Sequence, residues 1–337
     1  MKSSQVTIKD LAKELGLSPS TISRALNDHP DISEHTKKEV NDLASKLNYE
    51  PNVVAQNLRS QKTHTIGVIV PEIVHFFFST VILGIEEIAY KAGYTVMFCQ
   101  TGESYEREVK DTKALLNQRI DGLIVSFSKE TVNFDHFKEV AEKIPVVLFD
   151  RETSELDVSK IIVDDYEGAV SATQHLINKK YNRIAHLSGP ENLKIGAERK
   201  RGYEDALKKN NREVDPNYIL PCFNGTMDEG FYCMQRLLAL PEPPDAIFAN
   251  NDMSAYGAMR AIKEANLKIP EDIGIVGFSN WQFSQLIEPQ LTTIAQPGEE
   301  MGREAAKRLI EELEDEGLKQ KPITKVLNTN LLIRKSS

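Results

Sequence analysis

The stretch TIKDLAKELGLSPSTISRALN, residues 7–27, decides how the N-terminal part of the chain folds. Its first apolar residues recur at the spacing of one helix face, and they are Ile8, Leu11, Ala12 and Leu15. Gly16 follows them as a typical helix stop. Because Ser18 is a good N-cap residue and Pro19 fits the first helical position, we expect a second helix to begin here.

Two further apolar patterns complete this N-terminal unit. The second helix buries Ile22, Ala25 and Leu26, and a third helix, which begins near Ser33, buries Val40, Leu43, Ala44 and Leu47. Two short helices joined by a tight turn, with a third closing the core, are typical of a helix-turn-helix domain. The alternative interpretation is a three-helix bundle with a polar face and no DNA partner.

In a helix-turn-helix domain the second helix enters the major groove of DNA. Hydroxyls and backbone N–H groups on its outer face suit phosphates, and Arg24 suits the two hydrogen-bond acceptors of guanine. The predicted DNA contacts of this domain are Thr7, Ser18, Pro19, Ser20, Thr21, Ser23, Arg24 and Asn27.

The net charge of −9 does not by itself indicate nucleic-acid binding. Residues 1–62 carry nine Lys/Arg against eight Asp/Glu, whereas the remaining 275 residues carry 32 against 42. The acidity therefore lies in the C-terminal body. Whole-chain charge governs solubility and non-specific binding, so it does not exclude a local DNA-contact surface on a near-neutral head.

Residues 7–27, together with LNYEPNVVAQNLRSQKTHTIGVIVPE at residues 47–72, closely resemble the head of the lactose- and galactose-repressor (LacI–GalR) family of bacterial transcription regulators. The match runs without a gap from Thr7 to about Pro71. It implies a hinge helix at residues 51–61, which is ordered only on the operator and pairs with its copy in the minor groove.

The same resemblance gives roles to single residues of the hinge. Leu58 matches the family's wedge, which inserts between base steps and bends the DNA. Asn52, Ala55 and Gln56 match neighbouring minor-groove positions. Without the resemblance, Leu58 would be interpreted as a packing residue of a linker helix.

From Thr65 onward, short apolar runs alternate with longer amphipathic runs. The predicted strands are residues 65–70, 94–99, 122–127, 145–150, 160–164, 183–188, 245–250 and 273–278. This alternation predicts parallel sheets that are covered by helices on both faces. These eight units exceed one ordinary open sheet and indicate two similar halves, with a ligand site beyond the carboxyl ends of the strands.

The resemblance extends through this body and implies a periplasmic-binding-protein-like core with two lobes, each a doubly wound parallel sheet. The chain is expected to cross between the lobes near Ile162, Thr292 and Pro322. The expected organisation is a helix-turn-helix domain (1–50), the hinge helix (51–61) and an effector-binding and dimerisation domain (62–337), with an N-lobe of about 62–162 and 293–322 and a C-lobe of about 163–292 and 323–337.

Several residues at strand ends match effector-contact positions of the family. They are Phe77, Phe78, Asp150, Arg151, Arg199, Asn251, Ser279 and Gln296, and Asp252 and Asn280 lie beside them. A polar set with two aromatic walls suits a hydroxylated or otherwise polar small molecule. Each residue alone could equally be a solvated loop residue or an interlobe hydrogen bond. For Asp252 the structural role is favoured, because an acidic residue suits the first turn of a helix.

The departures from the family pattern bear on the effector. Sugar-responsive members usually have an aspartate at Ser279 and often a stacking aromatic at Gly225, for which Phe223 or Trp281 could substitute. The polar contacts of purine-responsive members would fall on the apolar residues Leu193 and Ile195. A carbohydrate is the favoured effector, mostly because the family commonly senses sugars.

Other features exclude alternative classes of protein. No run of about 18 apolar residues would span a membrane, and the N-terminus lacks the apolar core of a secretory signal. The odd number of cysteines, Cys99, Cys222 and Cys233, predicts a reduced cytoplasmic protein. No common hydrolase, P-loop, zinc-protease or dinucleotide motif is present, so we expect no enzyme, no metal and no cofactor.

These observations predict a regulator, a repressor under the resemblance, that binds a palindromic operator and is controlled by a small-molecule effector. Because the C-terminus lacks the heptad segment of tetrameric members, we expect a homodimer. The alternative functions are a soluble small-molecule-binding protein or a regulator that responds to a non-sugar metabolite.

Overall fold

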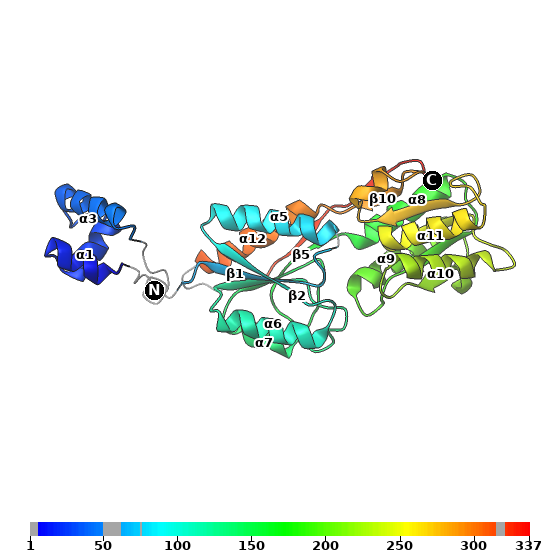
Figure 1. Cartoon of the computed structure of the whole chain (residues 1–337). Helices are drawn as coiled ribbons and strands as arrows, with labels where there is room; N and C mark the ends of the chain where they lie inside the picture. Colours follow the sequence, from blue (N-terminus) through cyan, green and yellow to red (C-terminus); the bar gives the residue numbers. More distant parts are fainter. Residues whose placement is uncertain (1–5, 50–61, 75, 315–320) are drawn as a thin grey trace. The chain divides into compact units, whose positions relative to one another are not determined.

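The computed structural model describes residues 6–49, 62–74, 76–314 and 321–337, and it divides into a compact unit up to Thr63 and a second from His64. In the first unit the described residues form α1 (Ile8–Leu15), α2 (Pro19–Leu26) and α3 (Glu34–Lys46) (Figure 1). Their buried apolar residues are Leu11, Ala12, Ile22, Ala25, Val40 and Ala44. The predicted three-helix arrangement is therefore confirmed.

Local signals in the sequence set the ends of these helices. The Asp10 carboxylate accepts a hydrogen bond of 2.8 Å from the backbone N–H of Thr7, which precedes α1. Gly16 ends α1 with a φ of 64°, a conformation that glycine adopts without strain. Ser18 Oγ accepts a hydrogen bond of 3.1 Å from the backbone N–H of Thr21 and so caps α2.

In the second unit the described residues form two sheets. The first has the strand order β11-β5-β4-β3-β1-β2, and all its pairs are parallel. Its strands are β1 (Thr65–Val70), β2 (Thr95–Gln100), β3 (Gly122–Val125), β4 (Val146–Phe149), β5 (Ser159–Val163) and β11 (Thr324–Leu327). Figure 1 shows α5 (Phe76–Lys91) and α12 (Gly298–Glu314) on one face, and α6 (Tyr105–Asn117) and α7 (Asp135–Ala141) on the other.

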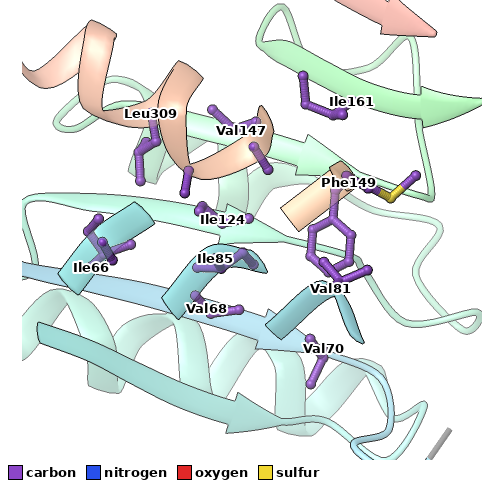
Figure 2. Packing of buried hydrophobic residues seen from close by; sticks show 14 of the residues in the cluster. Ile66, Val68, Val70, Val81, Ile85, Ile124, Val147, Phe149, Ile161 and Leu309 are labelled. Atoms are coloured by element: carbon purple, nitrogen blue, oxygen red, sulfur yellow. The ribbon is translucent and has the colours of Figure 1, made fainter. Parts of the chain in front are cut away.

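Side chains of α5 and α12 pack onto the middle strands of this sheet. Figure 2 shows Val81 and Ile85 of α5 and Leu309 of α12 against Ile124 and Val147. The two helices also lie very close to one another. A Cβ atom at Gly84 would lie 2.1 Å from the carbonyl oxygen of Glu299, so only glycine permits this contact.

The second sheet has the order β12-β10-β9-β8-β6-β7. Its strands are β6 (Ile184–Ser188), β7 (Ile219–Pro221), β8 (Ala246–Ala249), β9 (Gly274–Phe278), β10 (Thr292–Ala295) and β12 (Asn330–Leu332). The surrounding helices are α8 (Asp165–Asn178), α9 (Lys194–Lys209), α10 (Met227–Leu238) and α11 (Asp252–Glu264), with short 3-10 turns η1 (Pro216–Tyr218) and η2 (Gln282–Gln285). The predicted two-sheet α/β architecture is confirmed, except that β12 pairs with β10 in an antiparallel manner.

The lobe boundaries differ from the prediction at the C-terminal end. We expected the chain to return to the second lobe near Pro322, but β11 pairs with β5, with Thr324 opposite Lys160. The chain therefore stays in the first lobe until Leu327 and crosses before Asn330. We also expected a crossing near Thr292, but β10 pairs with β9 and β12 and keeps the chain in the second sheet until Ala295. Strand pattern alone cannot show which sheet accepts a strand, because the pairing partner is distant in sequence.

Candidate functional site

A cavity of about 590 Å³ lies between the two lobes, at the carboxyl ends of strands from both sheets. The predicted effector residues all line it, and they are Phe77, Phe78, Asp150, Arg151, Arg199, Asn251, Ser279 and Gln296. Asp150, Arg151, Asn251, Ser279 and Gln296 meet here because they follow β4, β8, β9 and β10, and parallel strands end at a common edge. The other three residues lie on helices, Phe77 and Phe78 on α5 and Arg199 on α9. Binding of an effector by these residues stays a prediction.

On the first lobe, Arg151 follows β4 and is buried. Its Nη1 and Nη2 atoms lie 2.8 and 2.6 Å from the two carboxylate oxygens of Glu103, and Nη1 also donates to the carbonyl oxygen of Phe127 at 2.7 Å. The pKa of Glu103 lies below its usual value because the attraction of Arg151 outweighs the effect of burial. The guanidinium charge is therefore matched by a protein carboxylate.

On the second lobe, Arg199 of α9 is matched in the same way. Its Nε and Nη2 atoms lie 2.7 Å from Asp165 Oδ1, and Nη1 donates to the carbonyl oxygen of Asn250 at 2.7 Å. The guanidinium also stacks on Phe278, with Cζ 3.7 Å from the ring centroid. Both arginines of the cavity thus have internal carboxylate partners.

Asp150 differs from these paired groups. It is only 5% exposed, and none of the described residues donates a hydrogen bond to its carboxylate. Burial raises the pKa of Asp150 to about 7, the negative charges of Asp165 and Glu103 act in the same direction, and Arg151 and Arg199 oppose the shift. Its φ of 61° is left-handed and turns the residue at the end of β4. Asp150 therefore offers an unpaired carboxyl group in the cavity wall.

Amide and hydroxyl groups complete the polar part of the wall. Ser279 Oγ donates to Gln296 Oε1 at 2.8 Å, and Gln296 Nε2 is buried without a partner in the described structure. Asn251 caps α11, where its Oδ1 accepts from the backbone N–H of Ser254 at 2.8 Å. Asp252 does not line this cavity, and its carboxylate accepts hydrogen bonds from Trp281, Ser284 and Thr293. It lies in the first turn of α11, where the structural interpretation expects an acidic residue.

The apolar part of the wall includes the residues at which the sequence departs from the family pattern. They are Leu193, Ile195 and Gly225, and the possible aromatic substitutes Phe223 and Trp281 also line the cavity. The Phe77 and Phe78 rings meet edge to face, with centroids 5.4 Å apart. Aromatic faces are thus available to an incoming ring even though glycine occupies position 225.

Sequence reasoning missed several polar residues of the wall, among them Glu103, Lys129 and Asn224. Glu103 and Lys129 follow β2 and β3, so the strand-end rule could have identified them. Lys129 Nζ lies 2.5 Å from Asn224 Oδ1, and its carbonyl oxygen accepts from Asn192 at 2.7 Å. These contacts connect the two lobes across the mouth of the cavity.

The predicted DNA-contact residues of the first unit lie at the surface. Thr7, Ser18, Pro19, Ser20, Arg24 and Asn27 are exposed, whereas Thr21 and Ser23 are half-buried. Some polar groups already have intramolecular roles, because Ser18 caps α2 and Asn27 Nδ2 donates to the carbonyl oxygen of Ser23 at 2.8 Å. The hinge residues Asn52, Ala55, Gln56 and Leu58 lie outside the described residues.

Two further searches cover the part of the chain that the structure describes. No group of three or more His, Cys, Asp or Glu side chains there could hold a metal ion. No helix within the same residues has the length and apolar character needed to cross a bilayer.

Comparison with known proteins identifies the two parts of the chain. Residues 7–52 match the family of bacterial regulatory proteins of the lacI type, and residues 63–332 match the periplasmic binding proteins and sugar-binding domain of the LacI family. The probable transcriptional repressor ExuR of Bacillus subtilis is 36% identical over 339 residues, which cover 98% of each chain.

Solved structures agree along the whole chain. The lac repressor dimer bound to operator and the anti-inducer ONPF is 27% identical, with a TM-score of 0.86 and 99% coverage of both chains. The complex of the regulator CelR with cellobiose is 28% identical, with a TM-score of 0.75, and the match covers 99% of this chain and 100% of CelR. The chain therefore belongs to the LacI family: it is a transcriptional repressor, not an enzyme, with a DNA-binding helix-turn-helix head and an effector-binding domain.

Proposed function

We propose that the effector is an uncharged carbohydrate, held in the cavity between the lobes. The observation that carries this proposal is the charge pairing in the wall. Arg151 and Arg199 are each matched by a carboxylate, so Lys129, which contacts the amide of Asn224, is the only cation of the described wall without an acidic partner. The unpaired carboxyl of Asp150 is a hydrogen-bond partner for a sugar hydroxyl. The cellobiose complex of the related CelR supports a sugar ligand.

A non-sugar metabolite is the second candidate. The edge-to-face pair of Phe77 and Phe78 and the nearby Trp281 favour a ligand with a flat apolar ring, such as a nucleoside. Both candidates are neutral and polar, so the charge argument does not separate them.

A thermal-shift panel separates these candidates. Purified protein is heated with neutral mono-, di- and oligosaccharides, sugar phosphates, uronic acids, nucleosides and amino acids. A ligand at about 100 times its Kd stabilises the folded protein by about 2.7 kcal/mol, which is several degrees. We expect a neutral sugar to raise Tm and Asp150→Asn to abolish the rise, with the exposed Asp157→Asn as the matched control. A rise only with anionic ligands would contradict the proposal.

For the DNA, we infer that α2 contacts base edges in the major groove of a palindromic operator. The exposed side chain of Arg24 and the backbone N–H groups at the N-terminus of α2 support this inference. The related lac repressor dimer, whose structure is bound to operator, supports it as well. The operator is selected from random DNA with the purified protein, and high affinity for it should require both half-sites. Equal affinity for one half-site and for the palindrome would refute binding as a dimer.

We further propose that the functional form is a homodimer. Large apolar side chains on the first lobe are exposed along β2 and α5, and they are Leu83, Tyr90, Met97 and Phe98. On the second lobe, an apolar cavity of about 550 Å³ includes Met259, Phe283 and Ile287. A second copy would remove these surfaces from water. Sedimentation should give a dimer for the wild type and a monomer for Leu83→Glu, whereas the exposed change Glu142→Gln should leave the dimer intact.

Effector and operator are proposed to be coupled through the relative position of the lobes. Coupling free energies of this kind are typically about 1–3 kcal/mol, which corresponds to about a 5–150-fold change in operator affinity. Fluorescence anisotropy with labelled operator, with and without the ligand found in the panel, measures this factor and its sign. No change in operator affinity at saturating ligand would refute the coupling.

A further inference from the structure

Two thiols meet at the wall of the cavity, where Cys222 lines it and Cys233 lies behind it. Cys222 Sγ lies 3.3 Å from Cys233 Sγ, and both residues are buried in the core between the second sheet and helices α10 and α11. Cys222 follows β7, whereas Cys233 lies in the middle of α10. The thiols are thus held in contact by two different elements of the fold.

Cys222 also begins a continuous segment of the cavity wall. Each residue of this segment lines the cavity, and they are Cys222, Phe223, Asn224, Gly225 and Thr226. Asn224 accepts the hydrogen bond of Lys129 from the other lobe, and Thr226 Oγ1 caps α10 by accepting from the backbone N–H of Glu229 at 3.2 Å. A covalent bond between residues 222 and 233 would therefore tie this wall segment to the helix that it caps.

We propose that Cys222 and Cys233 are a modification site, at which a peroxide forms a reversible disulfide that changes the shape of the cavity wall. A disulfide needs a sulfur–sulfur distance of about 2.05 Å. The two sulfur atoms lie 3.3 Å apart, so they must approach further. Since Cys233 is fixed in a helix, the displacement falls mainly on the wall segment that begins at Cys222.

The chemistry balances with hydrogen peroxide as the oxidant. Cys233, which accepts a hydrogen bond from the Cys222 thiol, attacks one peroxide oxygen as a thiolate. The O–O bond breaks, Cys233 becomes a sulfenic acid, and the departing hydroxide takes up the proton that the Cys233 thiol has lost and leaves as one water. The Cys222 sulfur then attacks the Cys233 sulfur, the S–O bond breaks and a second water leaves with the remaining thiol proton. Two thiols are oxidised by two electrons in total, and peroxide is reduced to two waters.

The third cysteine provides an internal control. Cys99 lies in β2, an edge strand of the first sheet, and is half-buried. It belongs to the other lobe, so it has no part in the proposed bond. Cys99→Ser should leave the oxidation of the pair unchanged, whereas Cys222→Ser and Cys233→Ser should each prevent it.

The experiment treats the full-length protein with hydrogen peroxide, blocks the remaining thiols and maps the peptides by mass spectrometry. We expect wild type and Cys99→Ser to yield a linked peptide pair that contains Cys222 and Cys233 and separates again on treatment with dithiothreitol. The single tryptophan, Trp281, lines the same cavity, so its fluorescence should change on oxidation and return on reduction. Neither effect is expected in Cys222→Ser or Cys233→Ser.

Two results would overturn the proposal. Oxygen adducts on separate cysteines, or a disulfide that involves Cys99, would show that Cys222 and Cys233 do not form the bond. A linked Cys222–Cys233 peptide without any reversible change in Trp281 fluorescence would refute the effect on the cavity wall. Neither test requires the effector to be known, and the peptide map of the wild type does not depend on the folding of a variant.

Discussion

Arg199 Nε lies 2.7 Å from Asp165 Oδ1 in the wall of the interlobe cavity, and both side chains are almost entirely buried. Arg199 is thus a structural residue as well as a predicted effector contact. The position of the pair explains why a simple alanine substitution at Arg199 would not isolate its contact with a ligand.

Arg199→Ala is expected to destabilise the protein by about 3–5 kcal/mol, because it leaves the buried carboxylate of Asp165 without its partner. Lys208→Ala is the control on the same helix, since Lys208 is exposed and pairs with Glu204 at the surface, and it should change stability by less than about 1 kcal/mol. Urea unfolding measures both. A loss below about 1 kcal/mol for Arg199→Ala would show that the ion pair is dispensable.

Asp150 should make stability depend on pH. Its pKa is about 7 in the folded protein and 3.8 as the ordinary value, so between these pH values the folded state holds a proton that the unfolded chain has lost. The contribution of Asp150 to folding therefore falls as pH rises, by up to about 1.4 kcal/mol per pH unit, and levels off above pH 7.

Asp150→Asn removes this dependence, and asparagine tolerates the left-handed φ at this position. The Tm of the variant relative to wild type should therefore be higher at pH 8 than at pH 5. Melting curves at both pH values measure the difference. A constant Tm difference would show that Asp150 is ionised throughout this range.

Glu103→Gln should shift the ligand preference toward anions. The substitution removes the negative charge that matches Arg151, and the amide oxygen can still accept one hydrogen bond from the guanidinium. We expect affinity for a uronic acid relative to the corresponding neutral sugar to rise by about tenfold, or about 1.4 kcal/mol. Calorimetry measures both affinities, with the exposed Glu130→Gln as the control. An unchanged ratio would refute the charge argument for a neutral effector.

Arg24→Ala should relax base preference at one position in each half-site, by about 1–3 kcal/mol per mismatch. The operator is first selected from random DNA with the wild type, and each base is then varied in a competition assay. Lys46→Ala, at the end of α3 and outside the predicted contacts, should keep the preference. If Arg24→Ala weakens all sequences equally, Arg24 contacts phosphate instead of base edges.

Leu58→Ala should weaken operator binding far more than non-specific binding, because a wedge acts only where the DNA is bent. This prediction rests on the sequence resemblance. Titrations of operator and of unrelated DNA at the same salt concentration give the ratio. Equal losses on both kinds of DNA would refute the wedge role.

The sequence by itself determined the local structure of this protein. Apolar spacing placed α1, α2 and α3, because a helix buries one face at a fixed period, and Ser18 and Gly16 set helix ends through their own backbone and side-chain chemistry. The family resemblance marked the predicted lining residues of the cavity, and those that follow β4, β8, β9 and β10 meet because parallel strands end at a common edge. These signals act within a few residues or follow from the fold class.

Only the tertiary structure decided which distant groups meet. It placed Asp165 against Arg199 and Glu103 against Arg151, joined β11 to the first sheet, and brought Cys222 to Cys233. It also buried the carboxyl group of Asp150 and so raised its pKa. The physical reason is that burial and pairing depend on segments far apart in the chain, whose contacts are fixed by how the layers pack and not by any local pattern.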